Sequence, residues 1–161
     1  MAVKVSIISV GKVKDKYIEL GINEFKKRLS RFCKLSIQVL KDESIPENVS
    51  EKEQILIKEK EGSLILNSIP KDSFLVVMDI DGKHLSSMEL ASEFNRIFNY
   101  HSSHIVFVIG GSLGISDRIK RMADLKLSFS HLTFPHQLFK LIMLEQIYRC
   151  FKINANESYH K

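Results

Sequence analysis

The chain has 161 residues, a formal net charge of +5 and 44% hydrophobic residues. This composition excludes a disordered chain and is typical of a single folded domain, here residues 1–161, with a core of its own. The sequence has no charged-then-apolar leader and no apolar run of the roughly 18 residues that a membrane span needs. We therefore expect a soluble, cytoplasmic protein with no membrane partner, in which Cys33 and Cys150 are reduced and buried.

The charges are spread unevenly along the chain. Residues 12–34 carry a net charge of +5 and residues 117–161 a net charge of +4, whereas residues 41–101 carry −5. Two basic segments around an acidic centre are compatible with an RNA partner. An ordinary solvated surface would produce the same pattern, so charge alone leaves both interpretations open.

The first part of the chain alternates between strand and helix patterns. Residues 3–10 predict a strand. Apolar residues spaced by three and four over Ile18–Phe32 predict a helix that starts near Lys14. Residues 35–39 alternate between apolar and polar side chains and predict a second strand, whereas the acidic, proline-containing stretch 41–49 indicates a loop.

A helix and a buried strand follow. Ser50 and Glu53 form a capping box, which predicts the start of a helix. This helix should run toward Ser68, with Gly62 weakening its middle. Residues 74–80 are an almost continuous apolar run and predict a strand near the centre of the sheet.

The next signals alternate in the same way. Asp81-Gly82 predicts a turn after the buried strand. Ser86 and Glu89 form a second capping box, which predicts another helix. Residues 105–109 are an unbroken run of β-branched and aromatic side chains, as expected for a strand that is buried on both faces of a parallel sheet.

The last third of the chain predicts a glycine loop at 110–114, a short helix from Ser116, a strand at 125–128, an irregular loop at 129–135 and a long helix from His136. Because strands and helices alternate throughout, we predict an α/β fold with a mostly parallel sheet flanked by helices. The loops after neighbouring parallel strands form a crevice at one edge of the sheet, where open α/β sheets bind ligands.

The glycine loop leaves two interpretations open. Gly110, Gly111 and Gly114 match neither the spacing of a dinucleotide-binding loop nor that of a P-loop. They either allow the backbone to approach a ligand closely or simply turn the chain after a buried strand.

A metal site is not expected. The six histidines do not stand at zinc-binding spacing with cysteine or acidic residues. The stretch 79–82 resembles the start of a calcium loop, but its glycine is misplaced and no glutamate closes the loop.

The helix from His136 is apolar on most of its circumference, although a surface helix needs only one apolar stripe. A second buried face is therefore implied, and we predict that a partner subunit covers part of it in a homodimer. Glu145 and Arg149 stand four positions apart on this helix, as in a surface ion pair.

Five short motifs, in their order and spacing, resemble one protein family over essentially the whole chain. They are Val108-Ile109-Gly110-Gly111-Ser112-x-Gly114, Leu127-Ser128-Phe129-Ser130, Thr133-Phe134-Pro135-His136-Gln137, Glu145-Gln146-x-Tyr148-Arg149 and Tyr159-His160-Lys161. The sequence resembles the RlmH family of SPOUT-class methyltransferases, which methylate a pseudouridine in large-subunit ribosomal RNA. The resemblance implies a SPOUT-like fold with a C-terminal trefoil knot and a homodimer.

The resemblance also implies that S-adenosylmethionine binds among three loops. An apolar slot with peptide donors and acceptors suits adenine, and glycines leave room near the ribose. The cofactor-binding residues would be Met78, Gly110, Gly111, Phe129, Ser130, His131, Leu132, Thr133 and Phe134. For Met78 and Phe129, plain core packing is the alternative interpretation.

The implied reaction is methyl transfer to the N3 ring nitrogen of a pseudouridine in 23S ribosomal RNA. Positioning should supply most of the acceleration, and the proton on N3 must leave to a base or to water. His160, Tyr159 and Arg149 are the candidate catalytic residues, and basic residues in 12–34 and 118–126 are candidates for RNA backbone contacts. The lack of an extra RNA-binding domain favours an already structured substrate, such as assembled ribosomes.

Two other functions stay open on the sequence. One is a non-catalytic RNA-binding or ribosome-binding α/β module, which would have no need of the loop at 129–134. The other is a methyltransferase of the same class that acts on transfer RNA.

Overall fold

The computed structural model describes residues 2–160. Five strands form one sheet in the order β2-β1-β4-β3-β5, and every described strand pair is parallel. The strands are Lys4–Val10 (β1), Lys34–Leu40 (β2), Phe74–His84 (β3), His104–Ile109 (β4) and Leu125–Ser128 (β5). The helices are Lys16–Leu29 (α1), Glu51–Ser68 (α2), Ser87–Tyr100 (α3), Asp117–Met122 (α4) and His136–Asn154 (α5).

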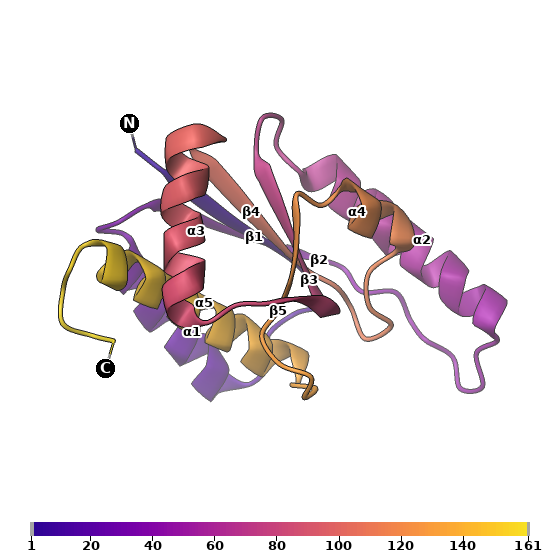
Figure 1. Ribbon diagram of the computed structural model, residues 1–161. Helices are drawn as coiled ribbons and strands as arrows, with labels where there is room; N and C mark the ends of the chain where they lie inside the picture. The colour runs from indigo at the N-terminus through magenta and orange to yellow at the C-terminus, as the bar shows by residue number, and fades with distance from the viewer. Residues whose placement is uncertain (1, 161) are drawn as a thin grey trace.

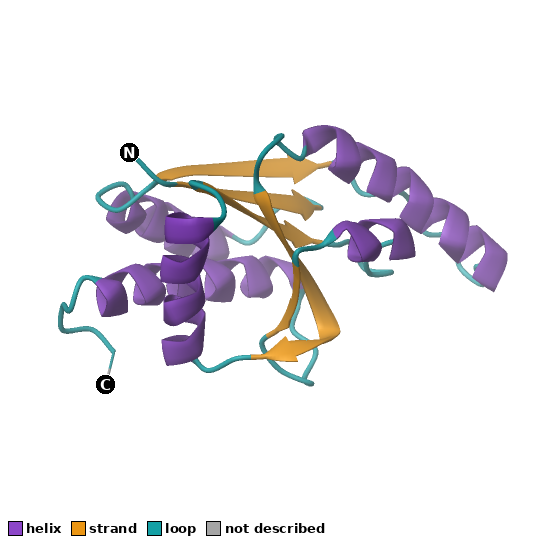
Figure 2. Ribbon diagram, turned by 45° about the horizontal axis from the view of Figure 1, so that its top comes forward, coloured by secondary structure: helices purple, strands orange, loops and turns teal. Residues whose placement is uncertain are grey.

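The sheet separates two helical layers. Helices α1, α3 and α5 cover one face, and α2 and α4 cover the other (Figures 1 and 2). Strand β4 contributes to both cores, because Ile105 and Phe107 face the larger layer while Val106 and Val108 face the smaller one. The predicted α/β fold with helices flanking the sheet is confirmed.

The middle position of the sheet belongs to β4. It pairs with β1 on one side and β3 on the other, which explains its unbroken apolar sequence. Strand β3, predicted to be near the centre, is an interior strand between β4 and β5. Strand β2 lies at an edge, and its burial alternates as predicted up to Ile37, whereas Val39 is exposed.

The predicted turn at Asp81-Gly82 is wrong. Strand β3 continues to His84, and β5 pairs with it on both sides of an irregularity between Met78 and Lys83. The local signal is present, because the Asp81 backbone N–H donates to an oxygen of Asp79 at 3.1 Å. Met78 and Lys83 both pair with Leu127, so the polar stretch between them bulges out and the strand then resumes in the same direction instead of reversing.

Helix starts follow the sequence signals closely. The Ser50 hydroxyl accepts from the Glu53 backbone N–H at 3.2 Å and caps α2, but the reciprocal bond of a capping box is formed only at Ser86 and Glu89. Helix α4 begins as predicted after Ser116, its capping residue. Helix α1 ends at Leu29, earlier than its apolar pattern suggested.

Both thiols are free and buried, as predicted. Burial raises the pKa of Cys33 and that of Cys150 to about 12, so neither thiol ionises at neutral pH. No described helix is long and apolar enough to span a membrane.

The apolar width of α5 has an explanation within one chain. The helix lies between α1 and α3 on the same face of the sheet (Figure 1). Phe151 stacks with Phe32 at 5.6 Å between ring centroids and meets the Phe94 ring edge-on at 5.7 Å. Contacts within one chain therefore cover part of the apolar surface from which a partner subunit was predicted, while Leu138, Leu141 and Tyr148 of α5 are only partly buried. The homodimer and the trefoil knot stay predictions from the family resemblance.

Gly62 has a packing role that the sequence did not indicate. A Cβ atom at this position would lie 2.7 Å from the hydroxyl oxygen and 3.3 Å from the Cβ of Ser116. Ser116 is buried and caps α4, so the missing side chain lets α2 and the start of α4 pack closely.

We predict that Gly62→Ala destabilises the protein. Alanine normally favours a helix over glycine by about 1 kcal/mol, but here the added methyl overpacks the contact with Ser116. The free energy of unfolding, measured in urea, should fall by about 1–2 kcal/mol. The exposed neighbour Ser63 supplies the control, because Ser63→Ala should change stability by less than about 0.5 kcal/mol. A Gly62→Ala protein as stable as the parent would contradict this packing role.

Candidate active site

The segments at the carboxyl ends of β3, β4 and β5 line a cavity of about 220 Å³. Parallel strands bring these segments to one edge of the sheet, as expected for an open α/β fold. Most of the lining is apolar, with Ile109, Ile115 and Leu127 beside the aromatic rings of Phe129 and Phe139. Backbone groups of the glycine loop and of the loop at 129–134 supply polar atoms.

The glycine loop is a tight turn that also forms one wall of this cavity. The Gly114 N–H donates to the Gly111 carbonyl at 2.9 Å, and Gly114 adopts a φ of +87°. A Cβ atom at Gly110 would lie 2.9 Å from the Gly114 backbone and 2.5 Å from Ile115. The two interpretations of this loop are therefore compatible, because the turn itself presents bare backbone to the cavity.

The loop at 129–134 is held by its own polar groups and by α5. The Ser128 hydroxyl donates to the Ser130 carbonyl at 3.1 Å, and the Ser130 hydroxyl accepts from the Leu132 N–H at 3.0 Å. The Phe129 ring packs against Phe139 of α5 at 5.5 Å between centroids. These contacts give the loop a defined shape beside the cavity.

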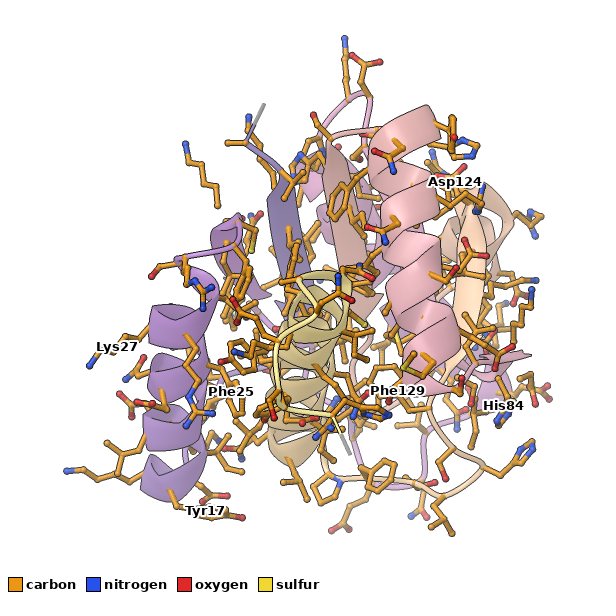
Figure 3. All side chains as sticks on the ribbon, turned by 60° about the vertical axis from the view of Figure 1, so that its left-hand side comes forward. Tyr17, Phe25, Lys27, His84, Asp124 and Phe129 are labelled. Carbon is orange, nitrogen blue, oxygen red and sulfur yellow. The ribbon has the colours of Figure 1, made fainter. Side chains whose placement is uncertain are left out.

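The structure brings together most of the predicted cofactor-binding residues. Eight of the nine predicted residues line the cavity: Met78, Gly110, Gly111, Phe129, Ser130, Leu132, Thr133 and Phe134. His131 does not line it, because its ring packs against the His84 ring at 4.3 Å between centroids. In Figure 3, the labelled His84 and Phe129 lie toward the same end of the molecule.

Glu61 on α2 is a buried carboxylate that sequence reasoning missed. It is 5% exposed and accepts from the Glu43 backbone N–H at 3.0 Å. One of its oxygens lies 2.9 Å from where a Cβ atom of Gly111 would stand, so it packs against the glycine loop. Burial raises the pKa of Glu61, and the nearby charges of Asp42 and Glu43 act in the same direction.

The candidate catalytic residues form a cluster of their own. The Arg149 guanidinium pairs with Glu145 and lies 3.1 Å from the His160 ring nitrogen Nδ1. The Tyr159 hydroxyl donates to Glu145 at 3.3 Å, and the Arg149 guanidinium lies 4.8 Å from the centre of the Tyr159 ring. The predicted ion pair is confirmed. The last residue of the fifth motif, Lys161, lies outside the described residues.

Ion pairs hold the C-terminal segment against the protein. Glu157 pairs with Arg31 at the end of α1 and with Lys152 of α5. The hydrogen bond from Arg31 lowers the pKa of Glu157 to about 2, and the bond from Lys152 acts in the same direction. The segment is therefore docked on α1 and α5 instead of being a frayed end.

This cluster is distant from the cavity of its own chain. His136 lines the cavity at the start of α5, whereas Arg149 stands thirteen positions later on the same helix. At 1.5 Å per residue, the two are about 20 Å apart along the helix axis. Figure 1 shows the C-terminal segment at the opposite end of α5 from the loop that precedes it. One chain by itself does not bring the candidate catalytic residues to the cavity.

We predict that Glu61→Gln makes stability less dependent on pH. A folded-state pKa above the unfolded value means that ionised Glu61 destabilises the fold, and this cost is absent below the ordinary carboxyl pKa of about 4.3. The cost grows as pH rises above that value. The unfolding free energy of the variant, relative to the parent, should therefore increase from pH 4 to pH 8. The control is Glu59→Gln at an exposed site of the same helix, and equal pH profiles for both variants would refute the effect.

Comparison with known proteins assigns the family. The sequence pattern of the family described as "Predicted SPOUT methyltransferase" matches residues 3–160. A protein of Clostridioides difficile (strain 630) named "Ribosomal RNA large subunit methyltransferase H" is 54% identical over 157 residues, 98% of this chain and 99% of the relative. Its namesake from Clostridium novyi (strain NT) is 52% identical over the same shares of both chains.

A solved structure shows the same fold at low identity. It is described as "a probable methylase family protein from Haemophilus influenzae Rd KW20", with a TM-score of 0.53 and 13% identity, over 98% of this chain and 70% of that chain. This likeness shows the fold alone. The family match over residues 3–160 and the relatives at 54% and 52% identity confirm the family predicted from the five motifs. The chain belongs to the SPOUT methyltransferase family.

Proposed function

We propose that this protein uses S-adenosylmethionine to methylate 23S ribosomal RNA in assembled ribosomes, at the N3 nitrogen of a pseudouridine. The main support is the identity of 54% over nearly the whole chain to a relative named as a methyltransferase of large-subunit ribosomal RNA. The cavity at the carboxyl edge of the sheet supplies a place for the cofactor.

The residues around the cavity fit the adenosine part of S-adenosylmethionine. Met78, Leu127 and Phe129 make an apolar slot for a purine ring, and the peptide groups of the loop at 129–134 offer hydrogen bonds to its edge. Gly110 presents backbone without a side chain, so a ribose can lie against it. When bound, the cofactor supplies an electrophilic methyl group on its sulfonium. The protein then has to orient the acceptor and exclude water.

Exposed basic residues support an RNA substrate. Lys26 and Lys27 are exposed on the last turn of α1, and Figure 3 shows Lys27 on the side of α1 away from the rest of the molecule. Phe25 instead packs against the Tyr148 ring of α5 at 5.9 Å between centroids. Cations on this outer surface are suited to contact phosphates without reading sequence.

The distance of about 20 Å along α5 supports a site completed by two chains. We propose a homodimer in which the cluster of Arg149, Tyr159 and His160 from one subunit lies beside the cofactor of the other. The docking of the C-terminal segment by Glu157 would then present this cluster in a fixed orientation. A trefoil knot, in which the last segment threads through a loop, is part of this proposal.

A methylation assay tests the function directly. The purified protein is incubated with radiolabelled S-adenosylmethionine and three acceptors: ribosomes from cells that lack this enzyme, free large-subunit RNA, and bulk transfer RNA. We expect label in the 23S RNA of assembled ribosomes, mapped to a pseudouridine. Label only in transfer RNA would retain the enzyme class and replace the substrate. No label and no calorimetric binding of the cofactor would favour a non-catalytic RNA-binding module.

We predict that Gly110→Ala weakens cofactor binding. The new methyl group would collide with the Gly114 backbone and with Ile115, so the turn must open and the cavity wall must move. Calorimetric titration with S-adenosylmethionine should show at least a tenfold weaker affinity. The control is Gly21→Ala on α1, where a new Cβ atom meets only the flexible end of Leu141. If Gly110→Ala bound the cofactor normally, the proposed site would be wrong.

We predict that truncation after Asn156 abolishes methylation and leaves cofactor binding intact. The truncated protein loses Glu157, Tyr159 and His160, which lie far from the cavity of their own chain. The rate of methyl transfer to ribosomes should fall at least a hundredfold, while the affinity for S-adenosylmethionine stays within about threefold of the parent. The melting temperature serves as the control for folding. Unchanged methylation would exclude a catalytic role for this segment.

A further inference from the structure

A second cavity of about 690 Å³ lies next to the cofactor cavity. The loops that follow β1 and β2 and the start of α5 build its walls. Ile109, Gly111 and His136 line both cavities, so the two share a wall. A cavity of this volume is within the range of small-molecule binding sites and is large enough for a nucleotide.

Two buried polar side chains line this cavity and have no partner among residues 2–160. The Ser9 hydroxyl is buried without a hydrogen bond, on a residue that is 2% exposed. Lys140 of α5 is 3% exposed, and no described residue accepts a hydrogen bond from its ammonium or forms an ion pair with it. Among residues 2–160, the Ser9 hydroxyl is the fully buried side-chain atom without a partner, whereas the Lys140 ammonium reaches the open space of the cavity at the end of a buried stem.

Other buried polar groups nearby are satisfied, which makes these two exceptional. Ser6, on the same strand as Ser9, hydrogen-bonds to Ser36 at 3.0 Å and to His104 at 2.7 Å. Glu61 accepts a backbone N–H. Buried polar groups in this core therefore usually have partners, and Ser9 and Lys140 are exceptions. A ligand with acceptor atoms would offset the free-energy cost of leaving these donors unpaired.

The rim of the cavity is positively charged and rigidly placed. Lys12, Lys14 and Lys41 are exposed there, and Asp42 is the acidic residue among them. The side-chain oxygen of Gln137 accepts from the backbone N–H groups of Lys14 at 2.6 Å and of its neighbour at 2.9 Å. This clamp fixes the backbone of the loop after β1, which carries Lys12 and Lys14, against α5.

We infer that this cavity holds one nucleotide of the RNA, whose phosphate contacts the rim lysines and whose base contacts Lys140 and Ser9. A uracil-type ring has two carbonyl oxygens beside its N–H, and two residues that line the cavity, Lys140 and Ser9, carry an ammonium and an unpaired hydroxyl that can donate to them. The shared wall places this base alongside the cofactor. A base can enter such a cavity only when it leaves its stack. The inference rests on the proposed function for the identity of the RNA.

The test measures nucleotide binding by the full-length protein, separately from methylation. Pseudouridine 5′-monophosphate is titrated and its affinity is followed by NMR shifts of the residues that line the cavity. Lys140→Met should weaken its binding at least tenfold, and Lys140→Arg, which keeps the charge, should restore most of it. Ser9→Ala should weaken it severalfold. The matched control is Lys52→Met on α2, an exposed lysine outside this cavity, which should bind as the parent does.

Stability separates a ligand-binding lysine from a structural one. Because Lys140 has no partner in the protein, Lys140→Met should melt at the same temperature as the parent or higher. A lower melting temperature together with weaker binding would indicate a structural lysine and overturn the inference. Binding within twofold of the parent would overturn it as well.

Two further probes identify the ligand class. Cytidine 5′-monophosphate replaces one ring carbonyl by an amino group and should bind severalfold more weakly than the pseudouridine nucleotide. Inorganic phosphate that competes as well as the nucleotide would reduce the site to a phosphate site and refute the base contact. Lys140-dependent nucleotide binding without methylation of any acceptor would refute the proposed function and leave this nucleotide site standing.

Discussion

Burial of β4 on both faces of the sheet is the constraint on which the rest of the structure depends. Its neighbours β1 and β3 run parallel to it, so the chain leaves all three strands at the same edge. The segment after β4 turns back at once, because Gly114 and Ile115 pack directly on Gly110. Both cavities and the start of α5 meet around this turn. A parallel sheet with a crowded central strand therefore concentrates bare backbone and loop side chains where a ligand can reach them.

The buried polar groups fall into two classes, those with hydrogen-bond partners inside the protein and those without. Ser6 and Glu61 have hydrogen-bond partners within the protein, as buried polar groups in stable folds do. Ser9 and Lys140 have none among residues 2–160 and line a cavity. Proteins keep such unfavourable groups mainly at functional sites, where stability is given up for binding. Among residues 2–160, the fully buried side-chain polar atom without a hydrogen-bond partner is therefore the Ser9 hydroxyl, on a residue that lines the second cavity.

Most secondary structure followed from local signals. The structure confirms the strand and helix patterns, the serine caps at Ser50 and Ser86, the short helix after Ser116 and the long helix from His136. Each of these depends on residues within one or two turns. The errors arose where distant segments intervene. Pairing with β5 continued β3 past Asp81-Gly82, and the close approach of Ser116 gave Gly62 a packing role that helix propensity does not indicate. Local propensity carries no information about such partners.

Motif order pointed to the family and to the loops of the cavity, and eight of the nine predicted cofactor-binding residues line it. The sequence pattern was sufficient to locate these loops because they follow buried strands directly. Tertiary packing alone decided the strand order, the place of His131 beside His84, and the separation of the Arg149 cluster from the cavity. It also decided that Ser9 and Lys140 line the same cavity, since these residues come from opposite ends of the chain. Periodicity records which face a residue takes, whereas long-range packing determines which residues share that face.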